Sequence, residues 1–259
     1  MRKMIIVAAA ALMAFTAQAE DKTGLKNESS LGYVVTGGNS ESETTSFKQK
    51  STYAWTSDIL KLSGHYIQAS GSVDDGAGGQ RDAVTAENWS ATLRFERVLT
   101  PKIFNLFVAH GWYGDRFQGV REGHSSDIGG TYFLVNDKET QVSTDFGYRY
   151  TRELLTALPD EKVGVGRPMH PEYHYLRLFL EAKHEYSKTF AFGAWVEYTP
   201  SITDFANDQR INYSPYITSV LSDMFSLKVS YEGRYRFRTA VAGAKNTDFT
   251  FTTALLAKF

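Results

Sequence analysis

The sequence predicts an all-β fold, an up-and-down antiparallel transmembrane β-barrel of twelve strands. Three observations support this prediction: an N-terminal export signal, twelve segments in which apolar and polar residues alternate, and connections that alternate between tight and long. Alternation with a period of two places apolar and polar side chains on opposite faces of a strand. In an outer-membrane barrel the apolar face meets lipid and the polar face meets the lumen.

The export signal occupies residues 1–19. Arg2 and Lys3 precede an apolar run over residues 4–15, and Ala17-Gln18-Ala19 supplies the small residues that signal peptidase requires. The run is too short to span a bilayer, and a buried N-terminal helix is the alternative interpretation. We expect cleavage after Ala19 and a single barrel domain over residues 20–259.

Composition limits the classes of protein. Without the two cations of the signal, 26 basic and 29 acidic residues remain, and this balance argues against a nucleic-acid partner. The chain has no cysteine, so no disulfide stabilises the exported domain. No apolar stretch approaches the roughly 20 residues of a membrane helix. Membrane association is therefore expected through strands.

Twelve segments alternate with a period of two. In chain order they are residues 25–37, 43–56, 59–71, 84–99, 102–114, 126–135, 139–153, 172–186, 189–202, 210–221, 224–239 and 247–259. Every second connection is tight, at residues 56–58, 100–102, 136–138, 187–189 and 222–223. The others are long, at residues 71–83, 115–125, 154–171, 204–209 and 240–246, apart from a compact first hairpin at 37–40.

This sorting of connections is typical of an outer-membrane barrel with short periplasmic turns and longer outer loops. A soluble sandwich has Greek-key crossings and no reason to sort loop length in this way. An even number of strands then places both termini in the periplasm. In hydrocarbon every backbone polar group must be paired within the protein, so the sheet is expected to close on itself.

Aromatic residues gather near both ends of the predicted strands. This is expected where a barrel meets the two lipid–water interfaces of the outer membrane. Those near the tight turns are Trp55, Phe104, Tyr186, Phe190 and Phe225. Those near the long loops are Tyr66, Trp89, Trp112, Tyr150, Tyr198, Tyr213 and Phe237. The last segment, TDFTFTTALLAKF, ends on Phe259 and resembles the C-terminal signal read by the barrel-assembly machinery, although Ala254 stands where glycine is frequent.

The less apolar face of each segment gives the charged side chains expected in the lumen. The thirteen cations are Lys26, Lys48, Lys50, Lys61, Arg94, Arg149, Arg177, Lys183, Lys228, Arg234, Arg236, Arg238 and Lys258. The eight acids are Glu28, Glu96, Asp127, Asp145, Glu181, Glu197, Glu232 and Asp248. A cation-rich lumen predicts a narrow channel for small anionic solutes. A lattice of salt bridges that plugs the lumen is the alternative.

Candidate selectivity residues follow from this set. They are the arginines Arg94, Arg149, Arg177, Arg234, Arg236 and Arg238, with the carboxylates Glu181 and Glu232. The three closely spaced arginines at 234, 236 and 238 belong to the stretch SLKVSYEGRYRFRTA, in which Tyr231, Tyr235 and Phe237 are expected on the lipid face.

Two other functions fit the same fold. A barrel-wall hydrolase would use a Ser-His-Asn arrangement, but no histidine belongs to a local nucleophile signature, and we expect the histidines on the surface. His170 and His174 alone fall short of a metal site. The second of these functions is that of a structural barrel whose loops bind a surface partner. Polar loops such as VDDGAGGQRD would be in contact with solvent and available to such a partner. We predict no catalytic residue, no metal and no cofactor.

Three stretches resemble a known family: GYVVTGGNSESETTSFK, DRFQGVREGHSSDIGGTYFLVND and DFGYRYTRE. They are similar to the YdiY-like salt-induced outer membrane proteins of Gram-negative cell envelopes, a domain of unknown function. The resemblance extends over nearly the whole mature chain. It implies an outer-membrane β-barrel and no particular activity. Gly38 is expected to take a positive φ in the first hairpin, and Gly129 and Gly130 to permit sharp barrel curvature.

Overall fold

The computed structural model describes residues 24–37, 42–74, 76, 79–115, 119–155, 170–237 and 245–259. The predicted signal peptide, the first hairpin with Gly38, and Arg238 lie outside these residues. No helix among the residues described is long and apolar enough to cross a membrane.

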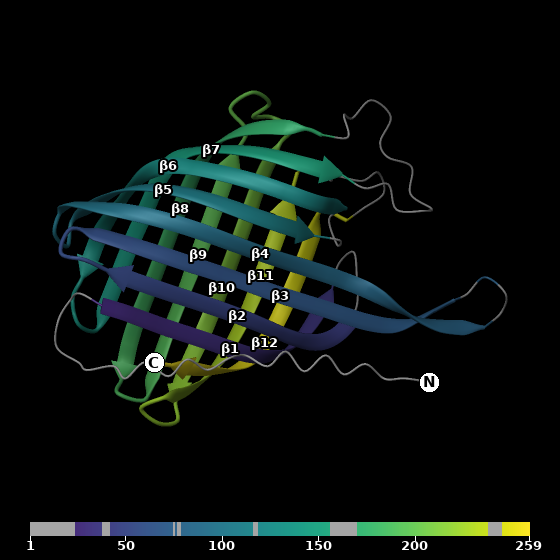
Figure 1. The fold of residues 1–259 in the computed structure, drawn as a ribbon, viewed down its shortest axis with the longest axis horizontal. Helices are drawn as coiled ribbons and strands as arrows, with labels where there is room; N and C mark the ends of the chain where they lie inside the picture. Colours follow the sequence, from purple (N-terminus) through teal and green to yellow (C-terminus); the bar gives the residue numbers. More distant parts are fainter. Residues whose placement is uncertain are drawn as a thin grey trace.

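Twelve antiparallel strands form one closed barrel, which confirms the predicted fold class (Figure 1). The strands are β1 (Gly24–Gly37), β2 (Ser42–Ala54), β3 (Asp58–Asp74), β4 (Gln80–Thr100), β5 (Phe104–Asp115), β6 (Val120–Asn136), β7 (Thr140–Leu155), β8 (Glu172–Ser187), β9 (Phe190–Pro200), β10 (Gln209–Val220), β11 (Phe225–Arg236) and β12 (Thr247–Lys258). Each strand pairs with its neighbours in sequence, and β1 pairs with β12. We call the end with the tight turns the turn end and the opposite end the loop end.

Several strands are longer at the loop end than the alternation predicts. β3 and β4 continue to Asp74 and Gln80, which pair with each other, so most of the predicted loop 71–83 is a strand hairpin that projects beyond the barrel (Figure 1). β6 likewise begins at Val120 and not at residue 126. Backbone pairing continues the ladder in these extensions beyond the alternating segments. The alternation therefore ends before the strands do.

Polarity is inverted relative to a water-soluble protein. Large apolar side chains point outward and are exposed, as for Leu31 (63%), Ile128 (58%) and Phe146 (61%). Charged side chains are among the most buried, and Glu96 and Glu153 are each 1% exposed. Exposed apolar surface of this extent is unusual for a soluble monomer. The outward face is therefore suited to an apolar environment.

Two glycines make room for aromatic side chains inside the barrel. A Cβ on Gly129 would lie 2.5 Å from the carbonyl oxygen of Phe146 and 2.9 Å from the ring of Phe107. A Cβ on Gly123 would clash with the ring of Tyr113. Gly129 faces Gly147 in the β6–β7 ladder. The glycines therefore allow a close approach of chain segments, which is one of the ordinary uses of glycine in strands.

The C-terminal residue lies at the seam that closes the barrel. The backbone N–H of Phe259 donates to the carbonyl oxygen of Asn27 at 3.1 Å, and the N–H of Asn27 donates back at 2.8 Å. Phe259 therefore extends the β1–β12 ladder by one pair, and its expected role as an assembly signal stays a prediction.

Candidate functional site

Two cavities occupy opposite ends of the barrel interior, and a smaller one of about 240 Å³ shares Lys50 and Ser63 with both. The loop-side cavity has a volume of about 610 Å³ and reaches Asp115, Arg210 and Arg236 at the loop end. The turn-side cavity has a volume of about 860 Å³ and reaches Lys188 and Lys258 at the turn end. Both are larger than a single solute of a few heavy atoms needs and fall within the range of ligand pockets.

The two cavities meet at a waist formed by five residues that line both of them. These are Lys50 on β2, Ser63 on β3, Phe179 and Glu181 on β8, and Trp195 on β9. β2 and β8 are six strands apart in the ring, as are β3 and β9, so the waist has two opposite walls. The rings of Phe179 and Trp195 stack with their centroids 6.0 Å apart. One wall of the waist is therefore aromatic and the other polar.

A chain of alternating charges follows the barrel wall from β4 to β9. Asp145 accepts from Nη1 of Arg94 and Nη1 of Arg177, each at 2.7 Å. Glu197 accepts from Nε of Arg177 at 2.7 Å and from Nη1 of Arg149 at 2.9 Å. We call Arg94, Asp145, Arg177, Glu197, Arg149 and Asp127 the wall network.

The ends of the wall network are also satisfied. Asp127 accepts from Nε of Arg149 at 2.8 Å. Glu96 accepts from Nε of Arg94 at 2.7 Å, and Lys61 donates to the same oxygen. The guanidinium of Arg94 lies 3.7 Å above the ring of Phe107, the residue that Gly129 makes room for. Three of the predicted selectivity arginines are thus held in rigid, paired positions.

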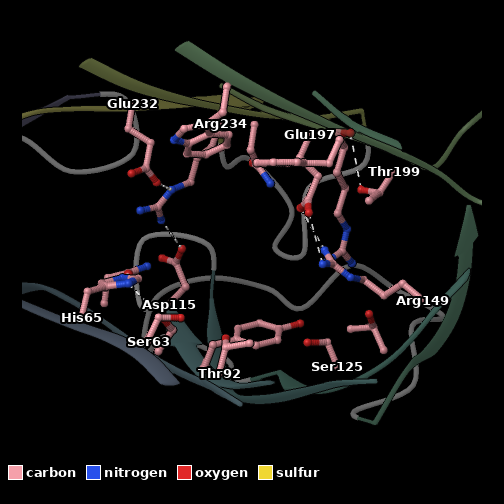
Figure 2. A pocket seen from close by; sticks show the side chains of 18 of the residues that line it. Ser63, His65, Thr92, Asp115, Ser125, Arg149, Glu197, Thr199, Glu232 and Arg234 are labelled. Carbon is pink, nitrogen blue, oxygen red and sulfur yellow. Dashed lines mark hydrogen bonds and ion pairs between the residues drawn. The ribbon is translucent and has the colours of Figure 1, made fainter. Parts of the chain in front are cut away.

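One ion pair crosses the lumen from wall to wall. Nη1 of Arg234 on β11 donates to Oδ2 of Asp115 on β5 at 2.9 Å, and the two strands are six positions apart in the twelve-stranded ring. Nε of Arg234 donates to Glu232 at 3.0 Å, and Lys48 lies 3.8 Å from the other oxygen of Glu232. Figure 2 shows Arg234 between Glu232 and Asp115, and Arg149 beside Glu197. The loop-side cavity is therefore spanned by charged side chains.

A single carboxylate joins three walls near the loop end. Oε1 of Glu153 accepts from the Tyr113 hydroxyl at 2.8 Å, from Nη1 of Arg210 at 2.8 Å and from Nη2 of Arg236 at 2.7 Å. Glu153 belongs to β7, and its partners belong to β5, β10 and β11. Oε2 of Glu153 has no hydrogen-bond partner among the residues described. Glu153 is therefore the centre of a buried cluster that holds two arginines.

The alternation pattern missed Glu153, Arg210 and Asp115. Glu153 and Arg210 stand at the ends of predicted segments, and Asp115 was assigned to a loop. Glu153 shares the parity of Asp145 and Arg149 on β7, so continuing the inward parity to the strand end would have found it.

The predicted selectivity residues divide into three groups. Five of the arginines, all except Arg238, line one of the two cavities and each has a carboxylate partner. Glu232 is paired with Arg234, while Glu181 lies at the waist. Arg238 is outside the residues described. The arginines at 234 and 236 therefore act as partners in separate clusters, and any role in selectivity stays a prediction.

The lysines are placed differently from the arginines. Six lysines line the turn-side cavity, at positions 50, 61, 183, 188, 228 and 258. With Arg94 and Arg177 they make eight cations, against the five carboxylates Glu28, Glu96, Asp145, Glu181 and Glu185. The loop-side cavity is closer to balance, with five cations and four carboxylates in its lining. Excess positive charge is thus concentrated at the turn end.

One histidine lies in the lumen, contrary to the expectation that the histidines are on the surface. Nδ1 of His65 accepts from the Ser90 hydroxyl at 2.8 Å, and its other ring nitrogen is hydrogen-bonded to Oδ1 of Asn88. All three residues line the loop-side cavity. The structure therefore brings together a serine, a histidine and an asparagine that no local motif predicted. No group of three His, Cys, Asp or Glu side chains suited to a metal ion occurs in the described part of the chain.

Solved structures resemble this chain at very low sequence identity. The structure titled NanC porin in a rhombohedral crystal form has a TM-score of 0.56 and 8% identity, covering 91% of this chain and 100% of that chain. A bacterial polysaccharide outer membrane secretin has a TM-score of 0.49 and 8% identity, covering 93% of this chain and 100% of that chain. KdgM porin in complex with disordered oligogalacturonate has a TM-score of 0.48 and 7% identity, covering 89% of this chain and 99% of that chain. The likeness to the NanC porin agrees with the twelve-stranded barrel and concerns the fold alone.

No curated protein matches the sequence. A family model described as a protein of unknown function, DUF481, matches residues 29–259. The match confirms the resemblance to the YdiY-like proteins, and the chain belongs to the DUF481 family.

Proposed function

We propose that the protein is an outer-membrane channel that conducts small anionic solutes through a narrow lumen. The observation that carries the proposal is the pair of cavities, about 610 and 860 Å³, that meet at the waist inside a closed barrel. A filled barrel would have no such pair of adjoining cavities. Channel function in such a fold depends on the charge and width of the lining.

Insertion in the outer membrane is supported by two features. The outward face is apolar and exposed, and every strand of the closed barrel has a partner on both sides, as hydrocarbon requires. The export signal that the sequence predicts at residues 1–19 supports the same location. In this orientation the turn end and both termini face the periplasm, outer-membrane lipid surrounds the wall, and the barrel-assembly machinery inserts the chain.

Anion preference is supported by the charges of the lining. The turn-side cavity has three more cations than carboxylates and the loop-side cavity one more. A fixed positive potential in a narrow, low-dielectric passage concentrates anions and repels cations. The ion pair between Arg234 and Asp115 narrows the passage at the loop end, so we expect a small conductance.

The test is single-channel recording of the folded protein in planar bilayers. We expect discrete steps of conductance and, in a KCl gradient, a reversal potential of the sign that chloride permeation gives. Arg234→Gln removes the side chain that crosses the lumen, so this variant should conduct more and discriminate less. Arg97→Gln is the matched control, because Arg97 faces outward, pairs with Asp58 and is 57% exposed as a side chain. A reversal potential of the opposite sign would contradict the anion preference.

The alternative function is that of a structural or surface-interaction barrel with a plugged lumen. The same recordings test it. The wall network and the Glu153 cluster favour it, since both tie together strands that are not adjacent in the ring. If neither the wild type nor Arg234→Gln conducts, the ion pairs are architectural and the channel proposal is wrong.

Hydrolysis is a second candidate function, favoured by the contacts of Ser90, His65 and Asn88. A serine hydroxyl on one ring nitrogen and an amide on the other resemble a nucleophile, a base and a residue that orients the base. We propose a non-enzymatic role, and expect folded protein to show no lipase or protease turnover. Turnover abolished by Ser90→Ala would replace the channel with a hydrolase.

A further inference from the structure

We propose that the turn-side cavity is a binding site for a small anion with two or more negative charges, a phosphate ester, a polyphosphate or a polycarboxylate. The inference deepens the proposed function and rests on it, because it names the class of solute and the end from which the solute is bound. Its geometric basis is the convergence of six lysines on one cavity of about 860 Å³.

The first argument is that ammonium groups approach the cavity from many directions. The lysines come from β2, β3, β8, β11 and β12 and from the tight turn after β8. A monovalent anion can neutralise only one or two of them at a time. An anion with several charged oxygens can contact lysines of different strands at once, with charge-assisted hydrogen bonds that are stronger than neutral ones.

The second argument is that several of these lysines lack a carboxylate partner. Lys61 is paired with Glu96 and Lys183 with Glu185. The other four, at positions 50, 188, 228 and 258, have no carboxylate oxygen within 4.0 Å among the residues that the structure describes. Glu28 and Glu181 are the lining carboxylates without a cation at that distance in the same residues. Four cations against two carboxylates leave positive charge for a ligand.

Lys50 and Lys228 are the best placed of the four. Lys50 belongs to the waist, and it faces Glu28 across the β1–β2 ladder without forming an ion pair at 4.0 Å. The ammonium of Lys228 lies 4.2 Å above the ring of Tyr216, which fixes its position. Lysine is a flexible point charge that suits a phosphate or carboxylate of varied shape, whereas the arginines of this cavity are already paired with carboxylates.

The third argument concerns access. Arg149 and Glu197 of the wall network, and the pair between Arg234 and Asp115, line the lumen on the loop side of the waist. The turn-side cavity reaches Ser187 and Lys188, which belong to a tight turn at the rim. A ligand therefore enters the site from the turn end, which the proposed orientation places in the periplasm.

The test measures binding and conductance separately. Isothermal titration calorimetry in detergent uses pyrophosphate and citrate as the multivalent probes, with acetate as the monovalent one, at constant ionic strength. We expect pyrophosphate and citrate to bind and acetate not to bind. The double variant Lys50→Gln/Lys228→Gln should weaken binding by about tenfold or more, since a hydrogen bond to a charged group contributes on the order of one tenfold step.

Matched variants make the result specific. Lys102→Gln/Lys138→Gln removes the same two charges from tight turns at the same end, where both residues are exposed and neither lines the cavity. This control should bind as the wild type does. Lys50→Arg/Lys228→Arg keeps both charges and should retain most of the binding. Heat-modifiable gel mobility verifies that each variant is folded.

The results that overturn the inference differ from those that overturn the channel. Equal binding by the wild type and Lys50→Gln/Lys228→Gln, or no binding of either multivalent probe, removes the site. If the protein still conducts with anion selectivity in that case, the channel function is retained without the binding site. Binding that depends on Lys50 and Lys228 in a barrel without conductance retains the site and removes the channel. In recordings, pyrophosphate should block current from the turn end more strongly than from the loop end.

Discussion

The carboxylate of Glu153 offers a direct measure of how much the buried charges stabilise the barrel. Glu153 is 1% exposed, and its Oε1 accepts from Tyr113, Arg210 and Arg236. Oε2 has no partner among the residues described. In Glu153→Gln the amide oxygen can therefore keep all three hydrogen bonds, with the amide nitrogen placed where Oε2 is. The substitution removes a charge and little else.

The expected loss follows from the two arginines left without a counter-ion. Removing one partner of a buried ion pair typically costs about 3–5 kcal/mol. Because Glu153→Gln retains the hydrogen bonds, we expect the lower end, about 3 kcal/mol. With a urea dependence of roughly 3 kcal/mol per molar, the midpoint of unfolding would fall by about 1 M. Urea titration in detergent, followed by gel mobility of unboiled samples, measures this shift.

Glu185→Gln is the control for this prediction. Like Glu153, Glu185 has a cationic partner, because Nζ of Lys183 lies 2.6 Å from its carboxylate. The side chains of Glu185 and Lys183 are, however, 49% and 37% exposed. Exposed pairs contribute at most about 1 kcal/mol, so its midpoint should stay close to that of the wild type. Glu153→Gln/Arg236→Gln should be more stable than Glu153→Gln, because it removes one of the unpaired cations. Equal midpoints for Glu153→Gln and Glu185→Gln would refute the reasoning.

Three further predictions concern assembly and processing. Gly129→Val should lower the free energy of unfolding by about 3 kcal/mol or more, since the new Cβ would lie 2.5 Å from the carbonyl oxygen of Phe146. A free energy of urea unfolding within about 1 kcal/mol of the wild-type value would contradict this prediction. Deleting Phe259 should reduce the yield of heat-modifiable barrel in cells, while Phe259→Tyr should not; equal yields would argue against an assembly signal. Mass spectrometry of the exported protein should give residue 20 as its first residue, and retention of residues 1–19 would show that no signal is removed.

The parity of a strand could be read from the sequence, but its ends could not. β8 is apolar on both faces, and only its charged residues gave the expectation that Arg177 and Glu181 point inward; the structure places both, with Phe179, in the lumen. Closure of the barrel decides this, because the neighbouring strands fix which face of β8 turns inward. Strand ends were missed for another reason: beyond the apolar band a strand continues by backbone pairing alone, which leaves no mark in side-chain polarity.

The sequence by itself determined the inverted polarity, the number of strands and the excess of positive charge in the lumen, because period-two alternation is a local property of each strand. Tertiary structure alone decided which charges meet. Asp115 and Arg234 are 119 residues apart in sequence, and Arg94 and Asp145 are 51 apart, so their contacts depend on strand register summed around the ring. That sum also gave the arginines of the wall network their carboxylate partners, and left four lysines of the turn-side cavity without one among the residues described.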